Sequence, residues 1–242
     1  LAFARTEGIA GDSAIVLGAG MSNGVDATRF APTDAPSESD GAPVIGFVGR
    51  LARDKGVEEL ACAWHALREE FPSARLLLVG AWEPEDPVDP RWRAALETDE
   101  RVTLAGVVDD VVSYYRRMSV LAFPSHGSEG FPNAPMEAAA VGLPVVATRV
   151  VGCVDAVLDG VTGTLVPPRD ATALAAALRV YLHDPMLGRR HGAAGRERVC
   201  REFQPEAIWT ALHREYLRLL REQAHEARDA RRARRSHVTA GS

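Results

Sequence analysis

Short apolar runs alternate along the central part of the chain with segments whose apolar residues recur at helical spacing. The runs that predict strands cover residues 44–48, 75–79, 102–105, 120–123 and 144–148. The segments that predict helices cover residues 57–67, 90–96, 109–117, 133–141, 171–183 and 185–203. Strands that are apolar on both faces and alternate with helices are typical of a parallel sheet covered by helices. We therefore predict a doubly wound, Rossmann-like α/β domain over residues 42–204.

The flanking sequences differ in character from this domain. Residues 1–41 hold one short apolar run, residues 14–17, and a Pro/Ser/Asp-rich stretch, so we expect an interdomain hinge and linker there. Residues 205–226 predict a helix whose apolar stripe comprises Ile208, Leu212, Tyr216 and Leu219. Residues 227–242 are rich in Arg, and we expect them to form a disordered tail. Because the chain begins at Leu1 rather than Met, we expect it to be a piece of a longer protein.

Composition and charge narrow the class of protein. The 242 residues are 46% hydrophobic and 25% charged, which is typical of a globular domain, and the formal net charge of −5 implies no general attraction to nucleic acid. The three cysteines have no metal-type spacing, so we expect reduced thiols in the cytoplasm. From Arg221 to the end, the sequence contains six arginines and three acidic residues. This basic end is either a solvated tail or a peripheral contact with the inner face of the plasma membrane.

Two carboxylates, Glu129 and Glu137, flank the start of the Ala-rich helix predicted from residue 133. The free N–H groups and partial positive charge of a helix N-terminus favour an anion such as a phosphate. Since two prolines in this stretch have no N–H, the backbone donors are chiefly those of Gly130, Phe131, Asn133 and Ala134. Carboxylates on either side suit the hydroxyl groups of a bound sugar or ribose, so the pattern indicates a nucleotide-sugar site. The plain alternative is one loop acid and one solvated helix acid.

Two cations follow the first predicted strand. Arg50 and Lys55 lie five positions apart in the loop after that strand, and ligands of open parallel sheets bind at the carboxyl ends of the strands. A planar guanidinium and an ammonium point charge are both suited to a diphosphate leaving group. An ordinary exposed loop cation is the alternative for each of them.

The motifs occur together in the order and spacing of a known family. They comprise Phe47–Leu51, Lys55-Gly56, Leu76–Gly80, the Glu129/Glu137 pair, Gly142–Thr148 and Asp159–Pro168. Over about residues 16–220, the chain resembles the C-terminal, donor-binding half of the retaining glycosyltransferases of family 4, which have the GT-B fold. Within this family it resembles bacterial enzymes that build capsular or other surface polysaccharides.

The resemblance implies a role for each candidate residue. Glu137 is similar to the glutamate that accepts hydrogen bonds from the ribose, and Glu129 to the one that binds the hydroxyls of the donor sugar. Arg50, Lys55 and Glu129 are the expected catalytic residues. The expected donor-binding residues are Gly49, Gly106, Val107, Gly130, Phe131, Asn133, Ala134 and Glu137.

The resemblance also implies the reaction and its partners. The expected reaction is the transfer of a sugar, with retention, from a nucleotide diphosphate sugar to a glycan or lipid-linked acceptor. UDP is the favoured nucleotide and GDP the next. No metal or other cofactor is expected. The missing N-terminal domain is expected to hold the acceptor, so this chain alone is expected to be weak or inactive.

Two other functions remain as alternatives. A non-catalytic nucleotide-sugar-binding module would keep Arg50, Lys55 and Glu137, and the sequence does not separate it from an enzyme. A nicotinamide-dependent dehydrogenase domain is suggested by Gly18-Ala19-Gly20 after a short apolar run, but Asn23 stands where the fingerprint requires its last glycine. We therefore rank the dehydrogenase below the module.

Overall fold

The computed structural model describes residues 20–33, 41–127 and 129–239, with side chains described as far as residue 225. The chain divides into two compact units, one of Val25–Gln204 and one made of residues 1–24 and 205–242. The strand expected at residues 14–17 and the Gly18-Ala19 part of the dinucleotide-like motif lie outside the described residues.

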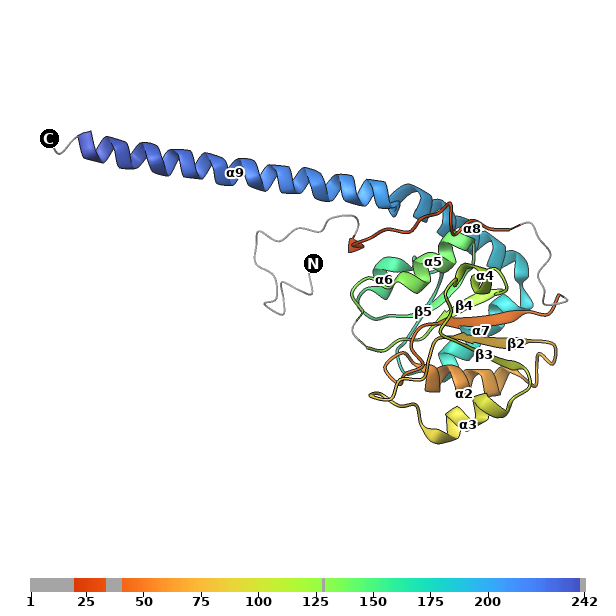
Figure 1. The fold of residues 1–242 in the computed structure, drawn as a ribbon. Helices are drawn as coiled ribbons and strands as arrows, with labels where there is room; N and C mark the ends of the chain where they lie inside the picture. Colours follow the sequence, from red (N-terminus) through yellow and green to blue (C-terminus); the bar gives the residue numbers. More distant parts are fainter. Residues whose placement is uncertain (1–19, 34–40, 128, 240–242) are drawn as a thin grey trace. The chain divides into compact units, whose positions relative to one another are not determined.

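The unit Val25–Gln204 is built on a six-stranded parallel sheet in the order β3-β2-β1-β4-β5-β6 (Figure 1). The strands are β1 (Val44–Val48), β2 (Arg75–Val79), β3 (Val102–Gly106), β4 (Val120–Phe123), β5 (Val145–Thr148) and β6 (Gly163–Val166). The chain adds strands outward from β1 to β3 and then returns to β4 on the other side of β1. This reversal confirms the predicted doubly wound topology.

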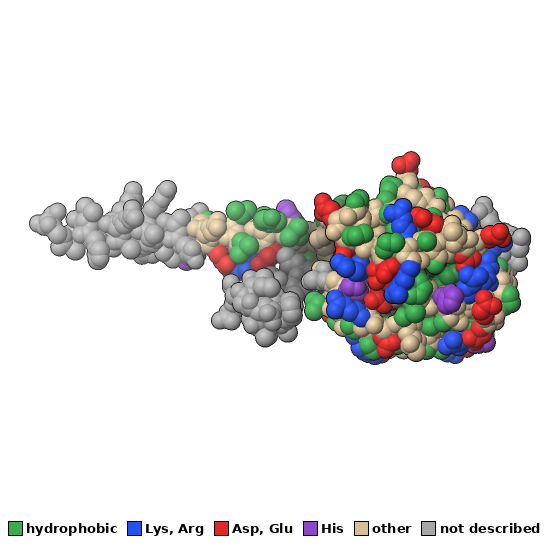
Figure 2. Space-filling model, turned by 90° about the horizontal axis from the view of Figure 1, so that it is seen from below, with side chains coloured by type: hydrophobic (Ala, Val, Ile, Leu, Met, Phe, Trp, Pro, Cys, Tyr) green, Lys and Arg blue, Asp and Glu red, His purple; other side chains and the backbone are tan. Residues whose placement is uncertain are grey.

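Helices cover both faces of the sheet. On one face α2 (Val57–Leu67) packs against α3 (Pro90–Thr98) and α7 (Ala171–His183). On the other, α5 (Asn133–Val141) packs against α4 (Val112–Tyr115), α6 (Cys153–Ala156) and α8 (Pro185–Glu202). Most strand residues lie buried between these layers, as expected for a doubly covered parallel sheet, whereas those of the edge strand β3 are half-buried or exposed. On the face of this unit shown in Figure 2, acidic and basic side chains are interspersed.

The strand and helix predictions are confirmed for most of this unit, with three differences. The helix predicted over residues 109–117 is shorter, since α4 covers only Val112–Tyr115. The sequence analysis missed the helix α6 and the strand β6, which have four residues each. The strands β4 and β5 are equally short, but they show three or four consecutive apolar residues, whereas β6 shows only two. The helix α6 is too short to show a helical period.

The helix α9 (Pro205–Thr239) is longer than predicted. It includes residues 227–239, where we expected disorder, so that expectation is wrong for this part of the tail. The reason lies in the composition, because Ala, Arg and Glu are strong helix formers and neither Gly nor Pro interrupts the segment before residue 241. Within the part of the chain that the structure describes, no helix is long and apolar enough to cross a membrane.

A glycine fixes the close contact between α8 and the end of α5. A Cβ atom added at Gly192 would lie 1.8 Å from the carbonyl oxygen of Gly142 and 2.6 Å from its carbonyl carbon. Backbone atoms cannot move aside as a flexible side chain can. Any larger residue at position 192 must therefore push α8 away from the α5–β5 connection.

Replacing Gly192 with Ala should lower the free energy of unfolding by about 2 kcal/mol, since overpacking costs roughly 1–3 kcal/mol. Gly188→Ala is the matched control on the same helix, because its added methyl group meets other atoms only at 3.6 Å and beyond. That variant should be unchanged or more stable, since Ala exceeds Gly in helix propensity by about 1 kcal/mol. Denaturant unfolding measures both variants, and wild-type stability of Gly192→Ala would contradict the contact.

Candidate functional site

A cavity of about 360 Å³ lies at the carboxyl ends of the first three strands. Its wall consists of three strand ends and their following residues, 48–50, 79–83 and 106–108, together with Val111 and Glu137. The cavity therefore brings together five of the residues predicted from sequence, which are Gly49, Arg50, Gly106, Val107 and Glu137. Its volume falls within the range of pockets that hold small ligands, roughly 300–1,000 Å³.

Glu137 supplies a carboxylate to this cavity from the second turn of α5. The hydroxyl of Tyr115 donates to its Oε2 atom at 2.9 Å. Burial of the half-buried carboxyl raises the pKa of Glu137, and the hydrogen bond from Tyr115 and the charge of Arg29 oppose that rise. Among the described residues, no hydrogen-bond donor reaches Oε1 of Glu137, so this oxygen is available to a ligand in the cavity.

Lys55 and Glu129, predicted separately from two distant loops, contact one another. Nζ of Lys55 lies 2.6 Å from Oε1 of Glu129, and the two side chains are only 17% and 13% exposed. The buried hydroxyl of Ser125 donates to the same oxygen, also at 2.6 Å. Ser125 is held in turn by Thr148, whose hydroxyl donates to the Ser125 carbonyl. Sequence analysis missed Ser125 and Thr148, because they contain no unusual chemistry and act only through contacts made in the fold.

The backbone brings the loop of Lys55 against the end of β4. Gly56 follows Lys55 with a φ of 73°, and a Cβ atom there would lie 2.2 Å from the carbonyl oxygen of Pro124. Only glycine permits both the left-handed conformation and this approach. The Lys55-Gly56 pair noted in the sequence therefore has a physical reason, since the glycine places the lysine within reach of Glu129.

Arg50 lies apart from Lys55, with Asp54 between them. The Arg50 side chain is 53% exposed, and its guanidinium pairs with Glu83 at 3.0 Å and with Asp54 at 3.4 Å. Asp54 also lies 3.7 Å from Nζ of Lys55. The hydrogen bond to Glu83 raises the pKa of Arg50. Both cations are therefore paired with carboxylates that the sequence analysis did not assign to the site.

The predicted backbone donors lie at the start of α5 and do not line the cavity of Glu137. No side chain caps the N-terminus of this helix. The ring of Phe131 packs against Phe203 with 5.3 Å between ring centroids, and a Cβ atom at Gly130 would meet open space. Asn133 is exposed and Ala134 half-buried. The roles predicted for these four residues remain predictions.

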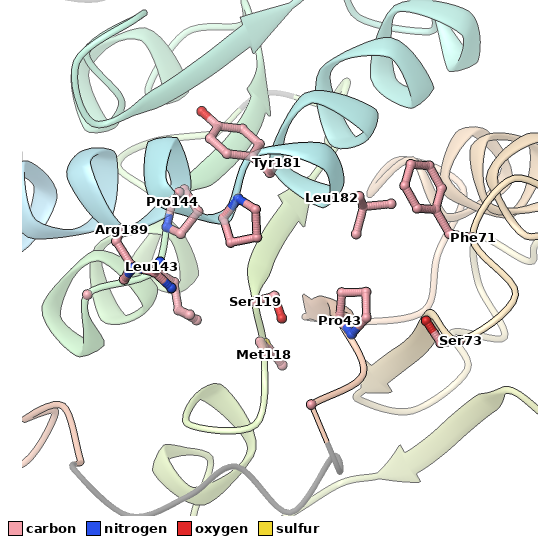
Figure 3. A pocket seen from close by; sticks show the side chains of 14 residues that line it. Pro43, Phe71, Ser73, Met118, Ser119, Leu143, Pro144, Tyr181, Leu182 and Arg189 are labelled. Atoms are coloured by element: carbon pink, nitrogen blue, oxygen red, sulfur yellow. The ribbon is translucent and has the colours of Figure 1, made fainter.

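A second cavity, of about 540 Å³, lies at the opposite, amino ends of the strands (Figure 3). The cavity is lined by the residues immediately before β1, β4 and β5, which are Pro43, Ser119 and Pro144, and by Tyr181 and Leu182 of α7. Among the described residues of its wall, Arg189 is the only charged one, and none is a site residue predicted from the sequence. The smaller cavity is therefore the better candidate for the functional site.

Comparison with known proteins identifies relatives of this unit. The family model described as Glycosyl transferases group 1 matches residues 42–184. The capsular polysaccharide biosynthesis glycosyltransferase CapM of Staphylococcus aureus is 34% identical over 213 residues, which are 86% of this chain and 56% of that protein. The chain thus spans about half the length of the curated relatives it matches.

Solved structures show the same fold. Sucrose-phosphate synthase from Thermosynechococcus elongatus matches with a TM-score of 0.71 and 33% identity, over 83% of this chain and 52% of that one. The C-terminal domain of the glycosyl transferase group 1 family protein LpcC from Francisella tularensis matches with a TM-score of 0.66 and 24% identity. This second match covers 75% of the present chain and 99% of the other, so the shared fold extends over nearly all of that solved domain.

The burial of each cysteine predicts which thiols react with an alkylating agent. Cys153 of α6 is fully buried, and burial, assisted by the charge of Glu129, raises its pKa to about 12. At pH 8 we expect iodoacetamide to alkylate the exposed Cys62 and Cys200 in the native protein and to spare Cys153 until the protein is unfolded. Mass spectrometry of peptides measures all three in one sample. Alkylation of Cys153 in the native protein at the rate of the other two thiols would show that the reagent reaches α6, and would contradict the burial of this thiol.

Proposed function

Because the chain belongs to the glycosyl transferases group 1 family, we propose that it is the donor-binding, C-terminal half of a GT-B glycosyltransferase. The observation that carries the proposal is the cavity at the carboxyl ends of the strands, with Arg50 and Glu137 in its wall and the Lys55–Glu129 pair nearby. The donor is a nucleoside diphosphate sugar. The dehydrogenase alternative loses its support, since Gly18-Ala19-Gly20 lies outside the matched segment.

In this proposal the nucleoside occupies the cavity. The base lies against the backbone of Gly49, Gly106 and Val107, and Oε1 of Glu137 accepts hydrogen bonds from the ribose hydroxyls. UDP is the proposed nucleotide and GDP the second candidate. HepE of Anabaena, which has the same fold with a TM-score of 0.69 and 23% identity, has been solved in complex with UDP-glucose. This likeness supports the fold, and the choice of nucleotide is left to the binding experiment below.

The cations of the site would stabilise the leaving diphosphate. When the bond between the anomeric carbon and the phosphate oxygen breaks, negative charge grows on that oxygen. Lys55 and the uncapped N-terminus of α5, with the backbone of Gly130, Phe131, Asn133 and Ala134, supply positive charge there. The exposed guanidinium of Arg50 exchanges its carboxylate partners for the diphosphate. No step in this account requires a metal ion.

Glu129 would bind the donor sugar. Lys55 and Ser125 both hold its Oε1 atom, which orients Oε2 toward a sugar hydroxyl. We place it as a binding and positioning carboxylate, in a family 4-type reaction that retains the anomeric configuration without a covalent sugar–enzyme intermediate. The acceptor, a glycan or lipid-linked sugar of a bacterial surface polysaccharide, would bind to the N-terminal half of the protein, and the basic end of α9 would contact the membrane.

Isothermal titration with UDP and GDP tests the site. We expect Arg50→Ala and Lys55→Ala each to weaken binding of the preferred nucleotide by roughly 1.5–3 kcal/mol, the contribution of a hydrogen bond to a charged group. Arg179→Ala is the matched control, because Arg179 is also a surface arginine in an ion pair, with Glu70, and does not line the cavity. Binding should be unchanged in this control.

Two outcomes of this titration would contradict the proposal. Wild-type affinity in both the Arg50→Ala and Lys55→Ala variants would remove these cations from the site. No binding of either nucleotide by the wild-type chain would contradict a donor site formed by this half. Tight nucleotide binding without sugar transfer, once the N-terminal half is present, would favour the non-catalytic module.

Removal of divalent cations tests the proposed metal independence. We expect the affinity for UDP to be the same in about 1 mM EDTA as in about 1 mM MgCl₂. Mg²⁺ is chelated in the first condition and available to the diphosphate in the second. The physical reason is that hydrogen bonds from Arg50, Lys55 and the helix N-terminus hold the diphosphate in place of a metal ion. Isothermal titration under the two conditions measures this, and loss of binding in EDTA would show that a metal ion is required.

A further inference from the structure

The phenol of Tyr115 lies against the carboxylate assigned to the ribose, although it belongs to none of the motifs noted in the sequence. We propose that Tyr115 is a positioning residue for ribose recognition, holding one oxygen of Glu137 so that the other faces the ribose hydroxyls. This inference rests on the proposed function and adds to it a residue that acts through Glu137.

The hydrogen bond of Tyr115 is directed at Glu137. Its hydroxyl lies 2.9 Å from Oε2 of Glu137 and 3.4 Å from the carbonyl oxygen of Ala134. A phenol has one proton to donate, and the shorter distance and the negative charge of the carboxylate both favour Glu137. The ring is fully buried, and burial together with the charge of Glu137 raises the pKa of Tyr115 well above 10. The hydroxyl therefore remains a donor.

The surroundings of Tyr115 fix the ring. Phe30 packs against it edge-on, with 6.1 Å between ring centroids. The next residue, Arg116, donates two hydrogen bonds to the carbonyl oxygen of Ala31, at 2.9 and 3.1 Å. The segment that precedes the sheet is thus fastened to Tyr115 and to the residue that follows it. A donor with a fixed ring gives the carboxylate one orientation before the nucleotide arrives, which is the condition for a preorganised site.

The hydrogen bond from Tyr115 to Oε2 of Glu137 has a consequence for ligand binding. With Oε2 engaged by Tyr115, Glu137 presents Oε1 to the cavity and remains the acceptor that two adjacent ribose hydroxyls require. Without the phenol hydroxyl, the carboxylate would lose a donor and gain freedom to rotate about its side-chain bonds. The ribose hydroxyls would then have to order it, which lowers the affinity for the ribose and leaves the contacts of the base and the diphosphate unchanged.

The charge of Glu137 adds a second consequence. The groups that face it are Tyr115 from α4, Arg29 from the segment before the sheet, and Arg50 and Glu83 across the cavity. Glu137 accepts hydrogen bonds as a carboxylate above its pKa and loses this capacity as the pH falls through it. Since the Tyr115 hydrogen bond favours the charged form, its removal raises the pKa of Glu137 further. Ribose recognition should then be lost at a higher pH.

Tyr115→Phe tests the inference, because it removes the hydroxyl and keeps the ring. The probes are UDP and 2′,3′-dideoxy-UDP, titrated calorimetrically into the full chain at several pH values. Wild type should prefer UDP by about tenfold, as for a hydrogen bond to a charged group. In Tyr115→Phe this preference should largely disappear, the affinity for dideoxy-UDP should be unchanged, and the acid loss of the preference should begin at a higher pH.

Matched variants separate positioning from packing. Tyr114→Phe is the control, since Tyr114 is the neighbouring, half-buried tyrosine of α4 and has no hydrogen bond to Glu137 among the described contacts. It should keep the wild-type preference for UDP. Glu137→Gln should also abolish the preference. The double variant Tyr115→Phe/Glu137→Gln should then be no worse than Glu137→Gln alone, because Tyr115 acts through this carboxylate.

The outcomes distinguish this inference from the proposed function. If wild type binds UDP with the expected preference and Tyr115→Phe retains both the preference and its pH profile, Tyr115 only packs, and the inference is wrong. If Tyr115→Phe weakens UDP and dideoxy-UDP equally, the variant damages the fold of the site, and the positioning role is likewise refuted. If the wild-type chain binds neither UDP nor GDP, the proposed function itself fails and this inference with it.

Discussion

The arrangement of the candidate site depends on the ion pair between Lys55 and Glu129. These residues lie in the loops after β1 and β4, the two strands between which the chain reverses direction across the sheet. Loss of one partner from an ion pair that is largely removed from water strongly destabilises a protein, because the remaining charge stays buried without its partner. Ser125 and Gly56 make the short distance possible, one by donating to the same oxygen and the other by admitting the Pro124 carbonyl. The same contact therefore joins the loops that follow two neighbouring strands and holds two of the candidate site residues together.

The two carboxylates of the site are held in the same way. In each, a buried neutral hydroxyl donates to one oxygen, Ser125 to Glu129 and Tyr115 to Glu137. A hydroxyl fixes the orientation of a carboxylate without neutralising it, whereas a cation does both. Among the described contacts, Glu137 has the hydroxyl and no direct ion pair, and burial raises its pKa. Glu129 has both the hydroxyl and Lys55. Glu137 and Glu129 therefore share one kind of hydrogen bond in two different environments, a half-buried cavity for Glu137 and a charged cluster for Glu129.

The sequence was sufficient for the architecture, because the strands from β1 to β5 are mostly apolar and carry this signal in adjacent residues. It was insufficient for β6, which has only two adjacent apolar residues, and for α6, whose four residues are too few to show a helical period. Arg50, Lys55, Glu129 and Glu137 stood out as charged residues at strand and helix ends. Their partners did not, since Tyr115 meets Glu137 from 22 positions away and Glu83 meets Arg50 from 33. Contacts of this range are set by the packing of the sheet and helices, and no local pattern encodes them.

The charges at the site place a constraint on how it binds an anion. Arg50 and Lys55 are the two cations, and the carboxylates of Asp54, Glu83 and Glu129 lie within 4 Å of them. A diphosphate therefore adds negative charge to a cluster in which the described carboxylates already outnumber the cations. Long-range attraction does not account for such binding, since the formal charges of these five side chains sum to a negative value. Short-range hydrogen bonds must do so, from a guanidinium that exchanges its carboxylate partners and from the N–H groups at the start of α5, which carry no opposing side chain. Affinity then depends on geometry more than on net charge, and for this reason the buried hydroxyls that fix the two carboxylates matter as much as the cations.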